Sequence, residues 1–426
     1  MPKNKTQYES EQVAGNGLLH RRLFLSGGMA LVGAGFLGVK QAQAANPTDF
    51  PDWMRVEGSS AGEYGLRSSH ESDVVRLVNP RQGAVAIASG SRTPLERLEG
   101  MITPNALHFE RHHSGIPDIN PDQHRLMLHG MVQRPLSFSM DALHRYPMET
   151  RTHFIECSGN SRALNAANPV QGTAGSLHGL LSCTEWTGIP LAILLDEAGL
   201  DPSASWLLAE GADAAAMSRS IPLDKALDDA LLVLYQNGEA IRPSNGYPLR
   251  LLVPGYEGNA NVKWLRRLKV TDAPTMTRDE TSKYTDLLAD GTSRMFSLNL
   301  ESKSVITSPS GGQQMNGPGL YQISGLAWSG HGRITKVEVS ADGGLSWAEA
   351  ALSGPVHSKS LTRFRLPWRW NGNESILMSR ATDETGFIQP TRQQIFAKWG
   401  TRFGYHTNSI QCWGISGTGE VNNVYI

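Results

Sequence analysis

Cysteine is scarce in this chain of 426 residues, which contains only Cys157, Cys183 and Cys412. None of the three belongs to a CxxC or CxxCH motif, so the sequence has no attachment site for a c-type haem and no cysteine-ligated cluster of its own. The odd number leaves at least one thiol unpaired. A disulfide between Cys183 and Cys412 is possible, but nothing in the sequence supports it.

An excess of charge of one sign is also lacking. Lys and Arg number 39 against 40 Asp and Glu, which gives a net charge of -1 with no basic stripe. Nucleic acid is therefore not an expected partner. The 44 glycines and 23 prolines are typical of a protein rich in loops and strands rather than of a helical bundle.

The sequence has no apolar run long enough for a comfortable membrane span. The longest candidate, residues 29–39, is short and interrupted by glycine. It follows the pair Arg21-Arg22 and precedes Ala42-Gln-Ala44, a small-x-small cleavage pattern. These features predict a twin-arginine signal peptide over residues 1–44 and export of a folded protein to the periplasm.

Two kinds of pattern follow along the chain. Strands are expected at 125–130, 206–210, 230–235 and 249–254, with helices at 140–146 and 189–199, which indicates an α+β domain. From about residue 300 the segments 320–328, 334–340 and 376–381 alternate with a period of two, and Asp342-Gly-Gly predicts a hairpin turn. No helical run is expected there, and the pattern favours an immunoglobulin-like β-sandwich.

The most informative stretch is His153-Phe-Ile-Glu-Cys-Ser-Gly-Asn-Ser-Arg162. An apolar strand leads into Cys157, and Ser-Gly-Asn supplies the residues of a turn. A thiol at a strand end suits a soft metal or a nucleophile, whereas a lone cysteine can also be a buried structural residue.

Six separated motifs resemble the sulfite oxidase family of molybdopterin enzymes, over residues 100–405. The most similar branch is the molybdenum subunit of periplasmic sulfane dehydrogenases in the Sox thiosulfate-oxidising system. The motifs are Phe109-Glu-Arg-His-His113, Glu156-Cys-Ser-Gly-Asn160, Gly211-Ala-Asp213, Asn245-Gly-Tyr-Pro-Leu-Arg250, Asn261-Val-Lys-Trp-Leu265 and Trp399-Gly-Thr-Arg402.

The resemblance implies a molybdopterin cofactor whose molybdenum is bound by Cys157. Cationic side chains suit the phosphate of the pterin, and a carboxylate can accept hydrogen bonds from its N–H groups. Trp264 is expected to pack in the core, and the scattered histidines His108, His112, His124 and His129 to be solvated or structural. The expected cofactor-binding residues are Phe109, Arg111, His113, Asp213, Asn245, Arg250, Asn261, Val262 and Lys263.

The resemblance also implies catalytic roles for Arg111, Arg162 and Arg402, because guanidinium groups bind sulfur oxyanions well. Tyr284 matches the family's active-site tyrosine, whose phenol can relay protons. Two positions depart from the family pattern. Asn245 replaces a histidine, and Ser176 stands where the family has an aromatic wall of the sulfite pocket.

Together these observations predict a periplasmic molybdenum oxidoreductase that oxidises a sulfane sulfur held on a carrier protein's cysteine, with free sulfite as the alternative substrate. Because the chain has no haem, it needs a c-type cytochrome subunit, and the resemblance implies a homodimer within a heterotetramer. A cofactor-free binding protein, or a glycan hydrolase with an Asp-box hairpin, is the rival from another class. The expected domains are the signal peptide (1–44), an N-terminal extension (45–100), the molybdopterin-binding domain (101–295) and an immunoglobulin-like dimerisation domain with a C-terminal tail (296–426).

Overall fold

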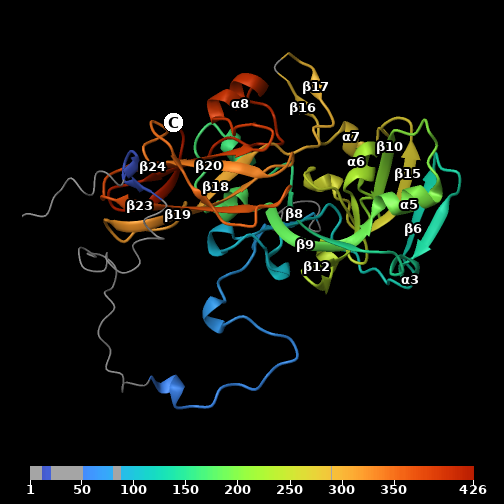
Figure 1. Cartoon of the computed structure of the whole chain (residues 1–426), viewed down its shortest axis with the longest axis horizontal. Helices are drawn as coiled ribbons and strands as arrows, with labels where there is room; N and C mark the ends of the chain where they lie inside the picture. Colours follow the sequence, from blue (N-terminus) through green and yellow to red (C-terminus); the bar gives the residue numbers. More distant parts are fainter. Residues whose placement is uncertain (1–11, 21–50, 80–87, 289) are drawn as a thin grey trace, which may run out of the picture.

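The computed structural model describes residues 12–20, 51–79, 88–288 and 290–426. Arg21, Arg22 and the apolar run after them lie outside these residues. Figure 1 shows two strand-rich halves side by side, one coloured mainly green and yellow and the other mainly orange and red. Helices are few and short, so the chain has the mixed, strand-rich architecture that the sequence predicts.

Two five-stranded sheets form the half that contains Cys157. One has the order β11-β10-β15-β6-β7, and the other has the order β13-β12-β9-β8 with β14 also paired to β12. The β6–β15 pair is parallel, and the neighbouring pairs are antiparallel. The bounds are β6 Arg125–Gly130, β7 Leu136–Ser139, β8 Glu149–Glu156, β9 Leu181–Pro190, β10 Trp206–Gly211, β11 Ser218–Pro222, β12 Leu231–Gln236, β13 Glu239–Ala240, β14 Arg250–Leu252 and β15 Leu265–Thr271.

Helices α5 (Leu191–Ala198) and α6 (Leu223–Asp228) complete the core of this half. The predicted helix after Ile189 is confirmed as α5, which stops at Gly199, where φ is +70° and a side chain would be strained. The predicted helix after Ser139 is α3 (Met140–Leu143), whose first turn is capped by the Ser139 hydroxyl accepting from the Ala142 N–H.

The other half is a sandwich of two antiparallel sheets, as the alternating pattern predicts. Their orders are β1-β2-β23-β19-β18, with β22 paired to β23, and β21-β20-β24-β25-β26. Large aromatic side chains fill the space between the sheets, because Trp328, Trp368, Trp413 and Phe364 are fully buried. The bounds are β1 Gln12–Ala14, β2 Leu18–Leu19, β18 Lys303–Ser308, β19 Gly319–Trp328, β20 Ile334–Ser340, β21 Ala348–Glu349, β22 Ala351–Leu352, β23 Thr362–Trp370, β24 Ser375–Asp383, β25 Cys412–Ile415 and β26 Val421–Val424.

The prediction that this half has no helix is wrong. Helix α8 spans Arg392–Trp399 and begins with a capping box in which Thr391 and Gln394 bond reciprocally to each other's backbone N–H groups. The remaining short elements are β3 Leu77–Asn79, β4 Gly90–Arg92, β5 Glu110–Arg111, β16 Asp286–Leu287, β17 Ser293–Arg294, α4 Ala174–His178, α7 Arg278–Thr281 and the 3-10 helices η1 Asp52–Met54, η2 Ser69–Glu71, η3 Leu95–Arg97, η4 Asn105–Leu107, η5 Arg162–Asn165, η6 Pro243–Asn245 and η7 Gly258–Ala260.

The two halves share packing beside Cys157. Phe154 and Leu181, on β8 and β9, belong to the same apolar cluster as Trp328 and Phe364 of the sandwich. The C-terminal segment also returns to the cysteine turn, where the His406 N–H donates to the Ser158 carbonyl at 2.8 Å. The strand that presents Cys157 is therefore supported from both sides of the expected domain boundary.

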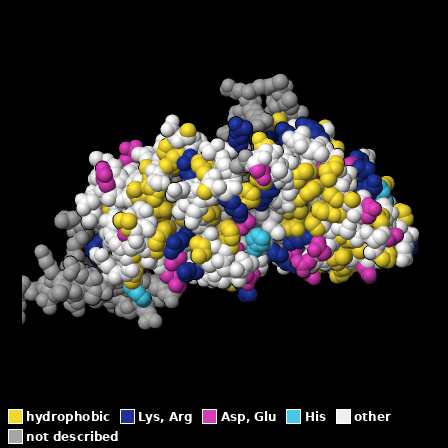
Figure 2. Space-filling model, turned by 90° about the horizontal axis from the view of Figure 1, so that it is seen from above, with side chains coloured by type: hydrophobic (Ala, Val, Ile, Leu, Met, Phe, Trp, Pro, Cys, Tyr) yellow, Lys and Arg dark blue, Asp and Glu magenta, His cyan; other side chains and the backbone are white. Residues whose placement is uncertain are grey.

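Three further findings concern thiols, membranes and charge. Cys157, Cys183 and Cys412 are all free, so the possible Cys183–Cys412 disulfide is not formed. Within the described ranges, no helix combines the length and apolar character needed to cross a bilayer. On the face that Figure 2 shows, Lys and Arg side chains are mixed with acidic and apolar ones rather than gathered in one stripe.

Candidate active site

Cys157 lies directly after β8, in the turn that the sequence predicts. Its N–H donates to the Leu180 carbonyl at 2.9 Å, and its own carbonyl accepts from the Asn160 N–H at 2.8 Å. The Asn160 amide donates to the Glu156 carboxylate at 2.9 Å, which closes the turn. Burial raises the pKa of the Cys157 thiol, and the nearby Arg111 charge opposes that shift.

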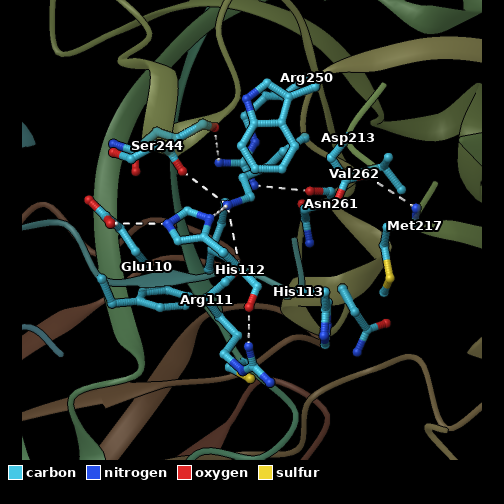
Figure 3. A pocket seen from close by; sticks show the side chains of 18 of the residues that line it. Glu110, Arg111, His112, His113, Asp213, Met217, Ser244, Arg250, Asn261 and Val262 are labelled. Carbon is cyan, nitrogen blue, oxygen red and sulfur yellow. Dashed lines mark hydrogen bonds and ion pairs between the residues drawn. The ribbon is translucent and has the colours of Figure 1, made fainter. Parts of the chain in front are cut away.

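A pocket of about 720 Å³, counting its open mouth, leads to this thiol. Its walls come from the β5 region, the turn after β10, and the loops before β14 and β15 (Figure 3). The pocket brings together most of the residues that the sequence singled out. These are Phe109, Arg111, His113, Cys157, Asp213, Asn245, Arg250, Asn261, Val262, Lys263 and Tyr284.

Arg250 gives the pocket a buried positive charge. Its two terminal nitrogens donate to the carbonyls of Asn245, at 2.8 Å, and Asn261, at 3.0 Å, whereas its Nε has no partner. Its guanidinium lies 5.1 Å from the ring centre of Trp186. Burial lowers the pKa of Arg250 to about 9, which reflects the cost of holding this charge without a facing carboxylate.

Lys263 adds a second cation to the same wall. Its Nζ donates to the Ser244 carbonyl at 3.0 Å and lies 2.8 Å from Nδ1 of His112. Burial, followed by the charge of Arg250, lowers the pKa of Lys263 well below its usual value. Two neighbouring cations at this depth are costly unless an anion binds between or beside them.

His112 also lines the pocket, whereas it was expected to be solvated or structural. Its Nε2 lies 3.0 Å from the Glu110 carboxylate (Figure 3), and that carboxylate also pairs with Arg76. Burial lowers the pKa of His112 to about 3, so its ring is neutral near pH 7 and can accept from the Lys263 ammonium. This contact joins segments separated by 151 residues, which local sequence patterns do not reveal.

Trp264 was expected to pack in the core, and it does so while also lining the pocket. It is 3% exposed, its Nε1 donates to the Pro243 carbonyl at 2.9 Å, and its ring centre lies 4.3 Å from Lys263 Nζ. Its φ of +54° is uncommon for a large side chain and occurs here beside the pocket wall. No spacing or composition signal in the sequence separates this tryptophan from an ordinary core residue.

Asp213 and the asparagines shape the wall in different ways. The Asp213 carboxylate accepts from the Met217 N–H at 3.3 Å and remains at the pocket surface. The Asn245 amide donates to Gln236 at 2.9 Å, and Asn261 accepts from the Val253 N–H at 2.7 Å. The Asn261 side chain therefore holds the backbone of the neighbouring loop in place, whereas the Asn245 side chain is fixed by the Gln236 side chain. The main-chain carbonyls of both asparagines are the acceptors for Arg250.

Tyr284 also lines the pocket, with its hydroxyl 3.4 Å from Nε2 of His113. The Arg219 guanidinium lies 4.7 Å from the centre of its ring and pairs with Glu257 and Glu280. Burial raises the pKa of Tyr284 and lowers that of His113 to about 4, so both groups are neutral near pH 7.

Three predicted positions do not line this pocket. Arg162 and Arg402 are exposed, and their segments lie close together, since a Cβ at Gly404 would lie 3.9 Å from Arg162 Cζ. Ser176 lies in α4, where its hydroxyl donates to the Thr173 carbonyl at 2.9 Å. The pocket entrance is therefore not widened by a serine at this position.

The chemistry of the lining fits the expected cofactor. The lining has more cationic than acidic side chains, with Arg111, Arg250 and Lys263 against Asp213 and Glu110. Of the two acids, Glu110 is already paired with Arg76. A buried cationic wall of this kind suits an anionic phosphate, and Asp213 can accept from pterin N–H groups. Cys157 in the same lining offers the soft thiolate that would suit molybdenum. In the described part of the chain no three His, Cys, Asp or Glu side chains converge as a metal site.

Comparison with known proteins agrees with this geometry. The family model for the oxidoreductase molybdopterin binding domain matches residues 113–278, and that for the Mo-co oxidoreductase dimerisation domain matches residues 294–412. Mitochondrial sulfite oxidase of Rattus norvegicus is 33% identical over 318 residues, which cover 68% of this chain and 58% of that protein. Sulfite oxidase of Gallus gallus is 31% identical over 328 residues, which cover 70% of each.

Among solved structures, one chain of the sulfane dehydrogenase SoxCD from Paracoccus pantotrophus is similar to this protein over nearly its whole length. The TM-score is 0.87 and the sequence identity 44%, over 89% of this chain and 98% of the solved one. The likeness extends across both halves, and the family models together cover Cys157, the pocket loops before β14 and β15, and most strands of the sandwich. The chain belongs to the sulfite oxidase family of molybdopterin oxidoreductases.

Proposed function

We propose that this chain is the molybdenum subunit of a dehydrogenase that oxidises the sulfane sulfur of a cysteine persulfide on a carrier protein. The observation that carries the proposal is the buried cationic pocket that opens onto the Cys157 thiol. The 44% identity with the SoxCD structure supports the sulfane substrate. Free sulfite is the alternative, which the likeness to animal sulfite oxidases favours.

Molybdopterin, when bound, supplies the redox chemistry, in which sulfur gains an oxygen atom that comes from water and gives up electrons that leave one at a time. Arg250 and Lys263 would hold its phosphate, and Asp213 would accept from its pterin. Cys157 would bind the molybdenum as a thiolate. Phe109, Asn245, Asn261 and Val262 would form the wall that orients the pterin.

The residues facing the substrate would bind charge and move protons. Arg111 lies at the pocket surface beside Cys157, whose thiol pKa it lowers against the effect of burial, so its charge can stabilise a developing sulfur oxyanion. The Tyr284 hydroxyl, 3.4 Å from His113, can pass a proton to or from the reacting oxygen. Arg162 and Arg402 would serve outside this pocket, where an anionic carrier arm could pass.

Asn245 supports a sulfane over a sulfite substrate. Where the family has a histidine, this neutral amide is bonded to Gln236 and cannot add a charge beside the cofactor. The Ser176 side chain lies outside the pocket lining, so it supports neither substrate over the other.

Partners and location complete the proposal. A c-type cytochrome would accept the electrons, and the sandwich, of immunoglobulin-like type, would make a homodimer contact within a heterotetramer. The match to the dimerisation model and the two-component SoxCD neighbour support this assembly. The twin arginine and the Ala42-Gln-Ala44 pattern support export to the periplasm, with a signal peptide over 1–44, an extension over 45–100 and the domain boundary near 295.

The deciding experiment compares two substrates on one enzyme. Protein matured in a host that makes molybdopterin is assayed with sulfane-loaded carrier protein and with free sulfite, using the same cytochrome. Faster reduction of the cytochrome by the loaded carrier supports the proposal. Fast sulfite oxidation with no gain from the carrier would establish the alternative, and protein without bound molybdenum and pterin would exclude both.

A further inference from the structure

The segment ahead of the twin arginine packs into the sandwich. Strands β1 (Gln12–Ala14) and β2 (Leu18–Leu19) form a hairpin, and Leu18 pairs with Trp368 at the edge of β23. Leu18 is 0% and Leu19 6% exposed, and Leu18 belongs to the main apolar cluster of the sandwich. Figure 1 shows this hairpin in blue against the orange and red strands β23 and β24. We name residues 12–19 the docking segment.

The turn of the docking segment is bonded to both sheets of the sandwich. The Asn16 amide donates to the Ala341 carbonyl at 2.7 Å and to the Ser375 hydroxyl at 2.8 Å. The Gly15 N–H donates to the Ser346 hydroxyl at 2.7 Å. Ser375 begins β24, Ala341 follows β20, and Ser346 lies in the loop between β20 and β21, so all three belong to the sheet opposite β23 or its connections.

The β23 side makes an equally specific contact. The Trp368 indole donates to the Asn16 carbonyl at 2.7 Å, and the Arg369 N–H donates to the Gly17 carbonyl at 2.9 Å. Gly17 has a φ of +87°, and a Cβ there would lie 2.1 Å from the Arg369 carbonyl oxygen. Only glycine fits at this point, so the sequence Gly-Asn-Gly-Leu-Leu is matched to its site rather than paired as a generic strand.

The docking site exists only after strands of the C-terminal half have folded. Its parts come from Ala341, Ser346, β23 and Ser375, more than 300 residues after the docking segment, and the hydrogen bonds of Asn16 span 325 and 359 residues. Folding of both sheets must bring these parts together before Leu18 can be buried. The docking segment can therefore bind only when both sheets of the sandwich are folded.

The docking segment lies just before the twin arginine in the sequence. Arg21 follows Leu19 by two residues, and two residues of extended chain span at most about 7 Å. We infer that the sandwich carries a docking site for the leader of its own precursor, which ties the leader to the folded state of the C-terminal half. The docking rests on the contacts above, while its link to export rests on the periplasmic location proposed in the preceding subsection.

Hydrogen exchange on the purified full-length chain tests the docking. The Arg369 amide is the reporter, because its acceptor is Gly17. Leu18→Asp places a charge in the apolar core, and Gly17→Ala adds a Cβ against β23, so each should speed exchange of this amide by about tenfold or more. Val13→Asp is the matched control, since Val13 is 40% exposed in the same segment, and it should leave the rate unchanged.

Two outcomes would overturn the inference. One is the same Arg369 exchange rate in the wild type and in both docking variants. The other is an equal effect of Val13→Asp, which would show a loss of general stability rather than of docking. An Arg21→Lys, Arg22→Lys chain separates this inference from the export proposal. It should keep the wild-type exchange rate and lose export; retained export would count against the proposed route alone.

Discussion

The Nζ of Lys303 lies 2.8 Å from the carboxylate of Glu156, the residue directly before Cys157. Lys303 opens β18 in the sandwich, and Glu156 ends β8 in the other half, so this buried ion pair joins the two halves at the thiol. The second Glu156 oxygen accepts from the Trp328 indole at 2.6 Å, and Lys303 also donates to the Ser161 hydroxyl at 2.6 Å. The cysteine turn is therefore held by the sandwich.

Replacing Lys303 should loosen this turn. Lys303→Met leaves the Glu156 carboxylate buried without its cation, which costs about 3–5 kcal/mol. We expect a lower urea midpoint and faster reaction of the Cys157 thiol with a thiol reagent. Lys336→Met is the control, because Lys336 is 40% exposed and pairs with Glu338 at 3.3 Å, where such pairs contribute little. Equal effects of the two variants would contradict the role of the Lys303–Glu156 pair.

The Cys157 thiol should be the only one that turnover requires. Cys157→Ser replaces a soft thiolate with a hydroxyl and should abolish turnover and bound molybdenum. Cys183→Ala and Cys412→Ala should keep most activity, because both thiols are buried away from the pocket and burial raises their pKa values, to about 11 and about 12. Molybdenum analysis with an activity assay measures both effects, and near-normal rates in Cys157→Ser would refute the assignment.

Arg111 should contribute to catalysis through its charge. Removing a charge-assisted donor from a desolvated site costs about 2–4 kcal/mol, so Arg111→Gln should lower kcat/KM on the order of a hundredfold or more. Arg162→Gln tests the second arginine of the predicted anion site, and its exposed position outside the pocket lining predicts a smaller loss. Arg125→Gln is the control, since Arg125 is exposed, lies outside the pocket lining and donates to the carbonyls of Asp122 and His124 in the loop before β6. An unchanged kcat/KM in Arg111→Gln would make Arg111 a structural residue.

Features set by neighbouring residues could be predicted from the sequence. The turn after Cys157, the cap at Ser139 and the stop at Gly199 each depend on a few adjacent side chains, and all three are present. Helix α8 shows the same principle, although it was missed. Its start can be recognised in the sequence as a capping box, Thr391-Arg-Gln-Gln394. The alternating strand pattern of the segments before it led to the prediction of strands alone.

Features set by distant contacts could not be predicted in this way. His112 becomes part of the pocket because Lys263, 151 residues away, places its ammonium against the ring. Trp264 lines the pocket through an unusual backbone angle that no periodicity signals. The motifs in the sequence identified most of the residues that line the pocket. That Arg162 and Arg402 are exposed could be seen only in the folded structure.

Buried histidines should make the stability of the protein depend on pH. Burial lowers the pKa of His178 to about 3, and its ring lies 2.7 Å from the Ser161 hydroxyl and 3.1 Å from Gln411. Between about pH 6.5 and pH 3 the unfolded chain binds a proton at this residue and the folded chain does not. The free energy of unfolding therefore falls as the pH falls through this window, by about 1.4 kcal/mol per pH unit for one such group.

His178→Gln removes this titration and should reduce the slope of unfolding free energy against pH between pH 6 and pH 4, roughly by that amount. His331→Gln is the matched control because His331 is exposed, and it should leave the slope unchanged. Urea unfolding at a series of pH values measures both slopes. If His178→Gln kept the slope of the wild type, as His331→Gln is expected to do, protonation of His178 would not be what destabilises the folded chain in acid.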